Sequence, residues 1–89
     1  MTLQKRLQAV LRGGNLTVAD LARWFDRPDP TVRTWVTNGG EPRGGPLDVE
    51  QVMKKLARLE LLIEQGRHFP FPRLSPSERI ERLLSLKKR

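Results

Sequence analysis

Two short amphipathic segments separated by a pair of prolines constrain the fold of this chain more than any other feature. Thr17 is a favourable N-cap, and Asp20, three residues later, can bond back to it, so a helix is expected to begin here. This helix must end near Asp26, because the residue before a proline is pushed out of the α region. Its apolar side chains recur at helical spacing and predict one buried face: Val18, Leu21, Ala22 and Phe25.

A second helix is expected directly afterwards, over residues 30–38. Asp29 is the predicted N-cap, and Pro30 suits the first turn, where its missing N–H costs nothing. Helical periodicity assigns Val32, Trp35 and Val36 to its buried side. Short hydroxyls and an arginine can hydrogen-bond base edges and phosphates without blocking close approach. The opposite side and its flanks carry such groups and are the first candidates for DNA contact: Thr31, Arg33, Thr34, Thr37 and Asn38.

The net charge indicates which class of partner to consider first. Lys and Arg number 17 against 10 Asp and Glu, which gives +7. The excess is shared between residues 1–46, at +3, and residues 47–89, at +4. A uniformly basic fold is typical of proteins that meet polyanions, so double-stranded DNA is the expected partner and an anionic membrane surface ranks below it.

Several classes of function are disfavoured by composition. With no cysteine and a single histidine, the 89 residues offer neither thiolate ligands nor a histidine pair, so no metal and no cofactor is expected. An enzyme is not expected either, because no pair of carboxylates lies on an obvious cleft. No apolar run approaches the ~20 residues of a membrane span, and the first residues lack a signal-peptide core. The expected compartment is the cytoplasm of a bacterial cell or of a phage-infected host.

Helices are also expected on either side of this pair. Residues 2–12 place four apolar side chains on one face, and Gly13 and Gly14 end that helix. Residues 39–46, GGEPRGGP, cannot be helical and must turn sharply. Asp48 is the predicted cap of a long helix that ends at residue 65. Its buried face is expected to comprise Val49, Val52, Met53, Leu56, Leu59 and Ile63.

The C-terminal part reads as a linker followed by one short helix. Residues 67–74 are expected to be extended, with Phe69 and Phe71 on the domain surface. A capping-box pattern at residues 75–78 then starts a helix over residues 75–89. The predicted organisation is a DNA-binding domain at residues 1–66, a linker at 67–74 and a C-terminal helix for packing or assembly.

The central residues resemble the winged helix-turn-helix family of the MerR/excisionase type over roughly residues 16–56. Counting from Val18, the fourth, fifth, eighth, fifteenth and eighteenth positions are apolar or small where that motif packs its two helices. The string TVRTW, at residues 31–35, is similar to the family's recognition helix, and Arg43 lies in a Gly/Pro-rich loop placed like its wing. The following helix opens with Asp48 and Val49, as in that family. One departure is Asp26 at the ninth position, where glycine is common.

This resemblance implies an all-α fold, with a small wing loop or hairpin at residues 39–46 and a short C-terminal helix. It implies binding of double-stranded DNA through residues 30–38, in a bacterial or phage regulator of transcription or recombination. Arg43 is then either a backbone or minor-groove contact or simply an exposed turn residue. Arg23 and Arg27 are either phosphate contacts or solvated charges.

A weaker resemblance is to the small terminase subunits of tailed phages, in which a DNA-reading domain precedes helices for assembly and for a packaging partner. A homo-oligomer, a dimer or larger, would form through residues 59–63 and 80–86. A third possibility is a virion component or adaptor that has kept the fold without reading sequence. Two uses are therefore open for one group of apolar side chains, an intramolecular core or a subunit interface: Leu61, Leu62, Ile80, Leu83, Leu84 and Leu86.

Overall fold

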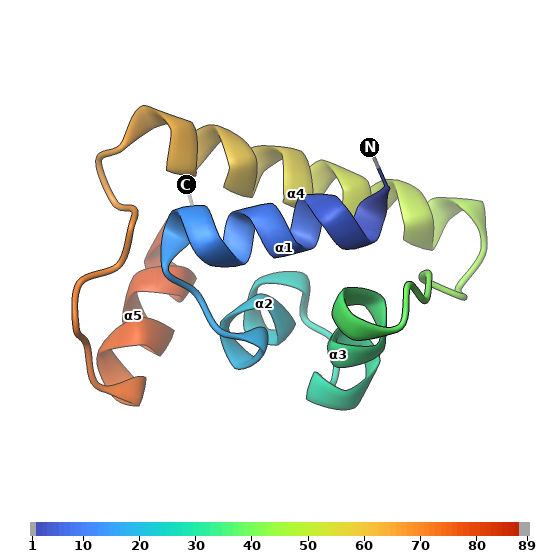
Figure 1. Ribbon diagram of the computed structural model, residues 1–89, viewed down its shortest axis with the longest axis horizontal. Coiled ribbons are helices and arrows are strands. Elements are labelled where there is room, and N and C mark those ends of the chain that lie inside the picture. Colours follow the sequence, from blue (N-terminus) through green and yellow to red (C-terminus); the bar gives the residue numbers. More distant parts are fainter. Residues whose placement is uncertain (1, 88–89) are drawn as a thin grey trace.

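The computed structural model describes residues 2–87, and these form helices joined by loops, with no strand among them (Figure 1). The expected all-α class is confirmed. Residues 38–45, where a small wing or hairpin was expected, form an irregular loop without a strand. Residues 88 and 89, which were assigned to the last helix, lie outside the described residues. In chain order the helices are α1 (Leu3–Gly14), α2 (Val18–Phe25), α3 (Asp29–Thr37), α4 (Pro46–Gln65) and α5 (Pro76–Lys87).

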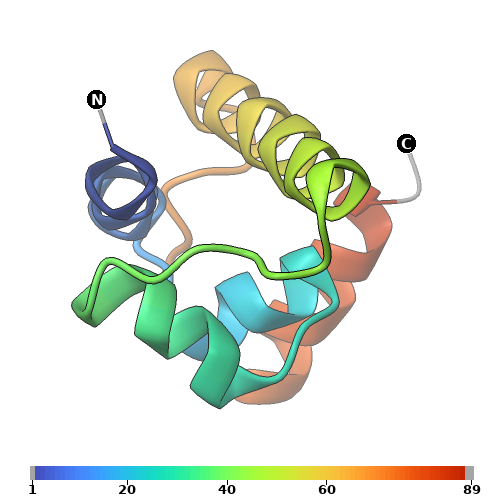
Figure 2. The ribbon, with the colours of Figure 1, turned by 90° about the vertical axis from the view of Figure 1, so that its right-hand side faces the viewer.

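The helices form two layers with α2 near the centre. α1 and α4 run side by side along one side of the molecule, and α5, α2 and α3 lie in a row beneath them (Figures 1 and 2). α2 packs against α3, α4 and α5, and α1 packs against α3 and α4. Because α2 has neighbours on three sides, most of its eight residues are buried: Asp20, Leu21, Ala22, Trp24 and Phe25.

The limits of α2 follow the predicted signals. Thr17 Oγ1 accepts the Asp20 N–H at 3.2 Å, and the Asp20 carboxylate accepts the Thr17 N–H at 3.0 Å, which completes the capping box. The helix ends at Asp26, whose φ of 58° places it in the left-handed region. Aspartate tolerates this conformation better than most residues other than glycine. The turn therefore keeps the backbone geometry for which glycine is the usual choice at this position.

The starts of the next two helices differ from expectation. The N-cap of α3 is Pro28 rather than Asp29. Asp29 lies in the first turn, where its carboxylate interacts favourably with the positive end of the helix dipole. α4 begins at Pro46, before the predicted cap Asp48. Asp48 instead lies in the first turn of α4 and pairs with Arg27. Val49, expected on the buried face, is 38% exposed.

The prediction that Phe69 and Phe71 lie on the surface is wrong. Both are buried, and their rings stack with centroids 4.8 Å apart. The backbone of Phe71 is also bonded to the end of α1: its N–H donates to the Gly14 carbonyl at 2.8 Å, and its carbonyl accepts from Asn15 Nδ2 at 2.7 Å. The segment bends rather than running as a regular extended strand, and its Phe69–Pro70 peptide bond is cis. Residues 67–74 are thus packed as well as connecting.

α5 completes the same core. Its capping box is present, with Ser75 and Glu78 bonded to each other's backbone N–H at 3.1 and 3.3 Å. The backbone hydrogen bond from Ser75, followed by the bond with its side chain, lowers the pKa of Glu78 below its ordinary value. Leu83 and Leu86 are buried within the chain, whereas Leu61 and Leu84 remain 52% and 46% exposed. No helix among residues 2–87 has the length and apolar character needed to cross a bilayer.

Candidate nucleic-acid interface

α3 has one side in the core and the other in solvent, as its sequence pattern predicts. Val32, Trp35 and Val36 are buried, and the Trp35 ring meets that of Phe25 edge to face, with centroids 6.0 Å apart. The opposite side offers polar groups at the surface and has no helix packed over it. The exposed residues there are the predicted contact residues of this helix and its C-cap: Thr31, Arg33, Thr34, Thr37 and Asn38.

The C-terminal end of α3 is held by two glutamines of α1, which the sequence did not reveal as site residues. Gln4 Nε2 donates to the carbonyls of Val36 and Thr37 at 3.1 and 3.2 Å, and Gln8 Nε2 donates to the Val36 carbonyl at 3.1 Å. The last carbonyls of a helix have no partner within it, so these bonds satisfy them. Gln4 and Gln8 are one turn apart on α1, but only the tertiary fold shows which carbonyls they meet.

The exposed threonines of α3 do not all present the same chemistry. Thr34 Oγ1 donates to the Pro30 carbonyl at 2.9 Å, and Thr37 Oγ1 donates to the Arg33 carbonyl at 2.8 Å. Such bonds to the preceding turn are common for threonine within helices. Within the described part of the chain, the Thr31 hydroxyl makes no comparable bond. Thr34 and Thr37 therefore keep only their oxygen lone pairs for an external partner.

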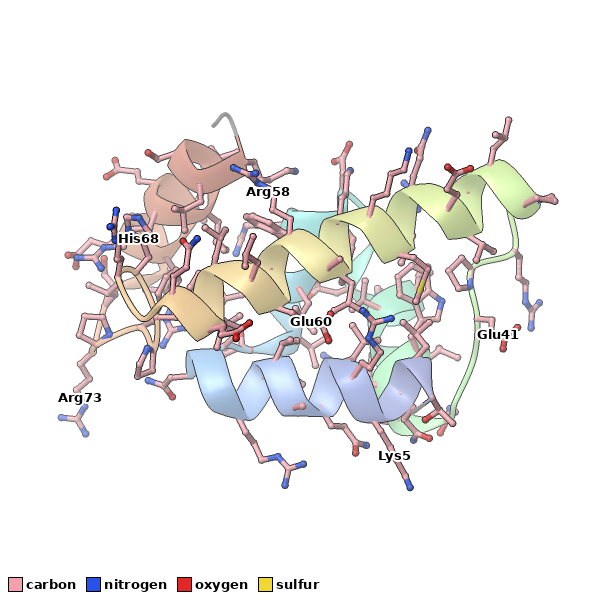
Figure 3. The ribbon with its side chains drawn as sticks, turned by 90° about the horizontal axis from the view of Figure 1, so that it is seen from above. Lys5, Glu41, Arg58, Glu60, His68 and Arg73 are labelled. Carbon is pink, nitrogen blue, oxygen red and sulfur yellow. The ribbon has the colours of Figure 1, made fainter. Side chains whose placement is uncertain are left out.

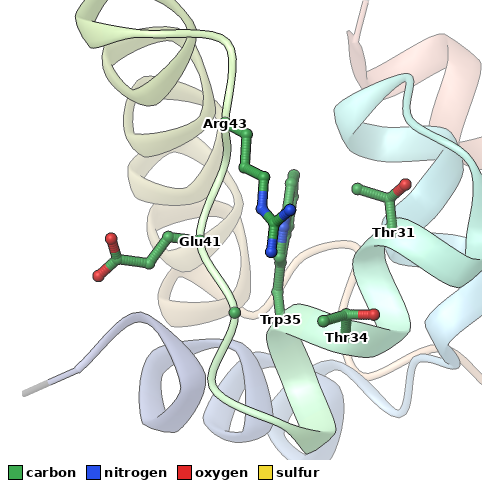
Figure 4. A pocket seen from close by; sticks show the side chains of 6 residues that line it. Thr31, Thr34, Trp35, Glu41 and Arg43 are labelled. Carbon is green, nitrogen blue, oxygen red and sulfur yellow. The ribbon is translucent and has the colours of Figure 1, made fainter.

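The loop at residues 38–45 returns to α3 and carries Arg43 there. The Gly40 N–H donates to the Thr34 carbonyl at 3.2 Å. Arg43 extends from the loop toward Trp35, whereas Glu41 points away from it (Figure 4). Between this loop and α3 lies an open depression of about 430 Å³, lined by Thr31, Thr34, Trp35, Gly40, Glu41 and Arg43. The structure thus brings Arg43 beside the exposed side of α3.

Gly40 permits this close approach. A Cβ atom at position 40 would lie 2.8 Å from Cγ2 of Thr34, whose hydroxyl is already bonded to the Pro30 carbonyl.

We expect Gly40→Ala to lower the free energy of unfolding by about 1–3 kcal/mol, the usual effect of overpacking. Urea unfolding would measure it. Thr34→Ser removes the obstructing methyl group, so most of the loss should be recovered in the double variant. An equal loss in both backgrounds would show that this contact does not position the loop.

Arg27 and Arg23 both lie close to carboxylates. Arg27 pairs with Asp48 and so ties the turn between α2 and α3 to the first turn of α4. Arg23 is exposed, and it shares a second depression with Asp26 and Asp29. These carboxylates would repel a phosphate. The structure therefore groups Arg43 with the exposed residues of α3 and leaves Arg23 and Arg27 outside that group.

The charge of the grouped residues is not neutralised from within. Ion pairs engage Arg6, Arg27, Lys54 and Arg79, among others of the described residues that have charged or polar partners, such as Arg58. Figure 3 shows Lys5, Arg58 and Arg73 on three different parts of the chain: α1, α4 and the segment between α4 and α5. Neither Arg33 nor Arg43 is paired with a carboxylate of the described residues, so both guanidinium groups have donors available for an anion.

Comparison with known proteins adds no relative. The chain matches no protein-family model, no curated protein and no solved structure. The resemblance to MerR/excisionase-type proteins therefore rests on the residues quoted above alone.

Proposed function

We propose that this protein binds double-stranded DNA, with α3 in the major groove and Arg43 against the neighbouring sugar–phosphate backbone. The observation that carries the proposal is the two-sided setting of α3: its apolar side is locked in the core, while its outer side carries Arg33 and short polar side chains. An α-helix of this kind fits the width of the major groove. Arginine and hydroxyl groups are suitable partners for base edges and phosphates.

The support for α3 favours recognition with little rearrangement. Gln4 and Gln8 hold its C-terminal carbonyls, and Gly40 fixes the adjoining loop against Thr34. A binding surface that is already ordered loses less conformational entropy on association. The positive net charge of +7 adds attraction to any duplex, and this part of the affinity should fall steeply with salt because bound counterions are released.

Arg33→Ala is the direct test of this function. If Arg33 contacts a base, its loss should weaken binding to a selected duplex by about 1–3 kcal/mol and relax the preference at one position. Fluorescence anisotropy titrations against selected and scrambled duplexes would measure both quantities. Arg73→Ala is the matched control, because Arg73 is an exposed arginine on the segment between α4 and α5. Equal behaviour of the two variants would remove Arg33 from the interface.

For the biological role we propose a bacterial or phage regulator of transcription or recombination as the first candidate, and a packaging subunit as the second. The packing of α5 supports this order: Leu83 and Leu86 are used in the chain's own core, so Leu84 is the one large apolar side chain of α5, among the described residues, that remains exposed. Light scattering on the purified protein would test it. A monomer or dimer agrees with the regulator, whereas a larger ring would favour a role like that of small terminase subunits.

A further inference from the structure

We infer that Thr34 and Thr37 act as hydrogen-bond acceptors toward DNA and favour adenine or cytosine over guanine or thymine on the strand that they contact, because only adenine and cytosine carry an exocyclic amino group in the major groove. This inference rests on the proposed function, since it requires α3 to lie in that groove. It goes further by assigning a chemical preference to two side chains whose residue type alone allows them to donate or to accept.

The assignment follows from where the hydroxyl protons go. A threonine hydroxyl has one proton, and those of Thr34 and Thr37 are directed to the carbonyls of Pro30 and Arg33 at 2.9 and 2.8 Å. A second contact restricts the rotamer of the Thr34 side chain. Its methyl group lies against Gly40, and its hydroxyl is turned away from the loop (Figure 4). Both side chains are exposed, so their oxygen lone pairs face solvent.

The major groove offers these acceptors only two kinds of partner among the bases. Adenine presents its N6 amino group and cytosine its N4 amino group, whereas guanine and thymine present carbonyl oxygens. Arg33, which can only donate, prefers guanine. The surface of α3 therefore combines one donor side chain with two acceptors. The preferred site should contain adenine or cytosine opposite the threonines and guanine opposite Arg33.

The size of the preference for an amino group over a carbonyl oxygen follows from the hydrogen bond between each hydroxyl and the preceding helical turn. To donate to a carbonyl oxygen of a base, either hydroxyl would have to rotate and give up its bond to the preceding turn. The net contribution of one such bond corresponds to a factor of about two to ten in an equilibrium constant. Each threonine is thus expected to favour an amino group by about twofold to tenfold.

The experiment combines protein variants with altered bases in the full-length chain. A duplex is first selected from a random library with the wild-type protein. Each adenine is then replaced by 2-aminopurine, which moves the amino group out of the major groove and still pairs with thymine. Each cytosine is replaced by 2-pyrimidinone, which lacks the amino group. Affinities are measured for the wild type, Thr34→Val, Thr37→Val and Thr37→Ser, so that double-mutant cycles cancel effects on the duplex itself.

The expected result is a loss of about twofold to tenfold on removing one particular amino group, seen with the wild type and Thr37→Ser but absent with Thr37→Val. A corresponding amino group should behave in the same way toward Thr34→Val. The inference is overturned if every amino group can be removed without loss, or if the loss persists unchanged in Thr34→Val and Thr37→Val. Binding to duplex DNA without any sequence preference would overturn this inference alone, whereas failure to bind duplex DNA would overturn the proposed function and this inference with it.

Discussion

Phe71→Ala is expected to lower the free energy of unfolding by about 3–5 kcal/mol, the usual range for removing a phenylalanine from a core. Phe71 is 1% exposed, stacks on Phe69 and lies under the guanidinium of Arg79, whose central carbon is 5.8 Å from the ring centroid. Its loss leaves a cavity between the end of α1 and α5. Because small domains are stable by only about 5–15 kcal/mol, urea unfolding should show a large fall in the midpoint.

Two further variants serve as comparisons for Phe71→Ala. Phe71→Leu keeps most of the buried volume and should cost less than about half as much, since changes of shape at similar volume are better tolerated. Arg73→Ala alters an exposed residue two positions away and should leave stability within about 0.5 kcal/mol of the wild type. If Phe71→Ala matched Arg73→Ala, residues 67–74 would be a surface linker after all.

Arg79→Ala is expected to destabilise the fold by a comparable amount, about 3–5 kcal/mol, because it leaves a buried carboxylate without its charged partner. Asp20 is 1% exposed, and its Oδ2 accepts both the Thr17 N–H at 3.0 Å and Arg79 Nη1 at 2.7 Å. Arg79 also donates to the Asn15 carbonyl at 3.3 Å. One side chain of α5 thus stabilises the start of α2, the helix on which α3 packs.

Arg82→Ala supplies the control, since Arg82 is exposed on the same helix. Chemical unfolding of Arg79→Ala, Asp20→Asn and the double variant would isolate the coupling between the two side chains. We expect the double variant to be less destabilised than the sum of the single variants, because removing both charges leaves none buried and unpaired. Strict additivity, or a loss no larger than that of Arg82→Ala, would mean that the ion pair does not hold α5 to α2.

Local patterns were sufficient for the helices and for the two sides of α3. Thr17 and Asp20 lie three residues apart, and a capping box depends on that spacing alone. Val32, Trp35 and Val36 likewise share a side of any helix that contains them. The exposed predicted contact residues of α3 follow from the same periodicity. These features involve residues within one or two turns of each other, so the order of side chains along the chain decides them.

The sequence could not predict environments that depend on distant parts of the chain. Phe69 and Phe71 stand in a proline-containing segment that has the composition of a linker, yet α1 and α5 enclose them. Arg27 carries the same charge as Arg33, but only Arg27 meets Asp48, 21 residues further on. Periodicity within one segment cannot predict such encounters, since they require the packing of several helices at once.

Short-range rules predict the all-α class, the turn at Pro28 and Pro30, and the division of α3 into an apolar and a polar side, because propensity, capping and periodicity act over a few residues. Long-range packing, in contrast, selects the cations that accompany the polar side. It placed Arg43 beside α3 through the contact of Gly40 with Thr34, and it engaged Arg27 in an ion pair. The effect of a charge depends on its neighbours in space, and these neighbours come from elements far apart in the chain.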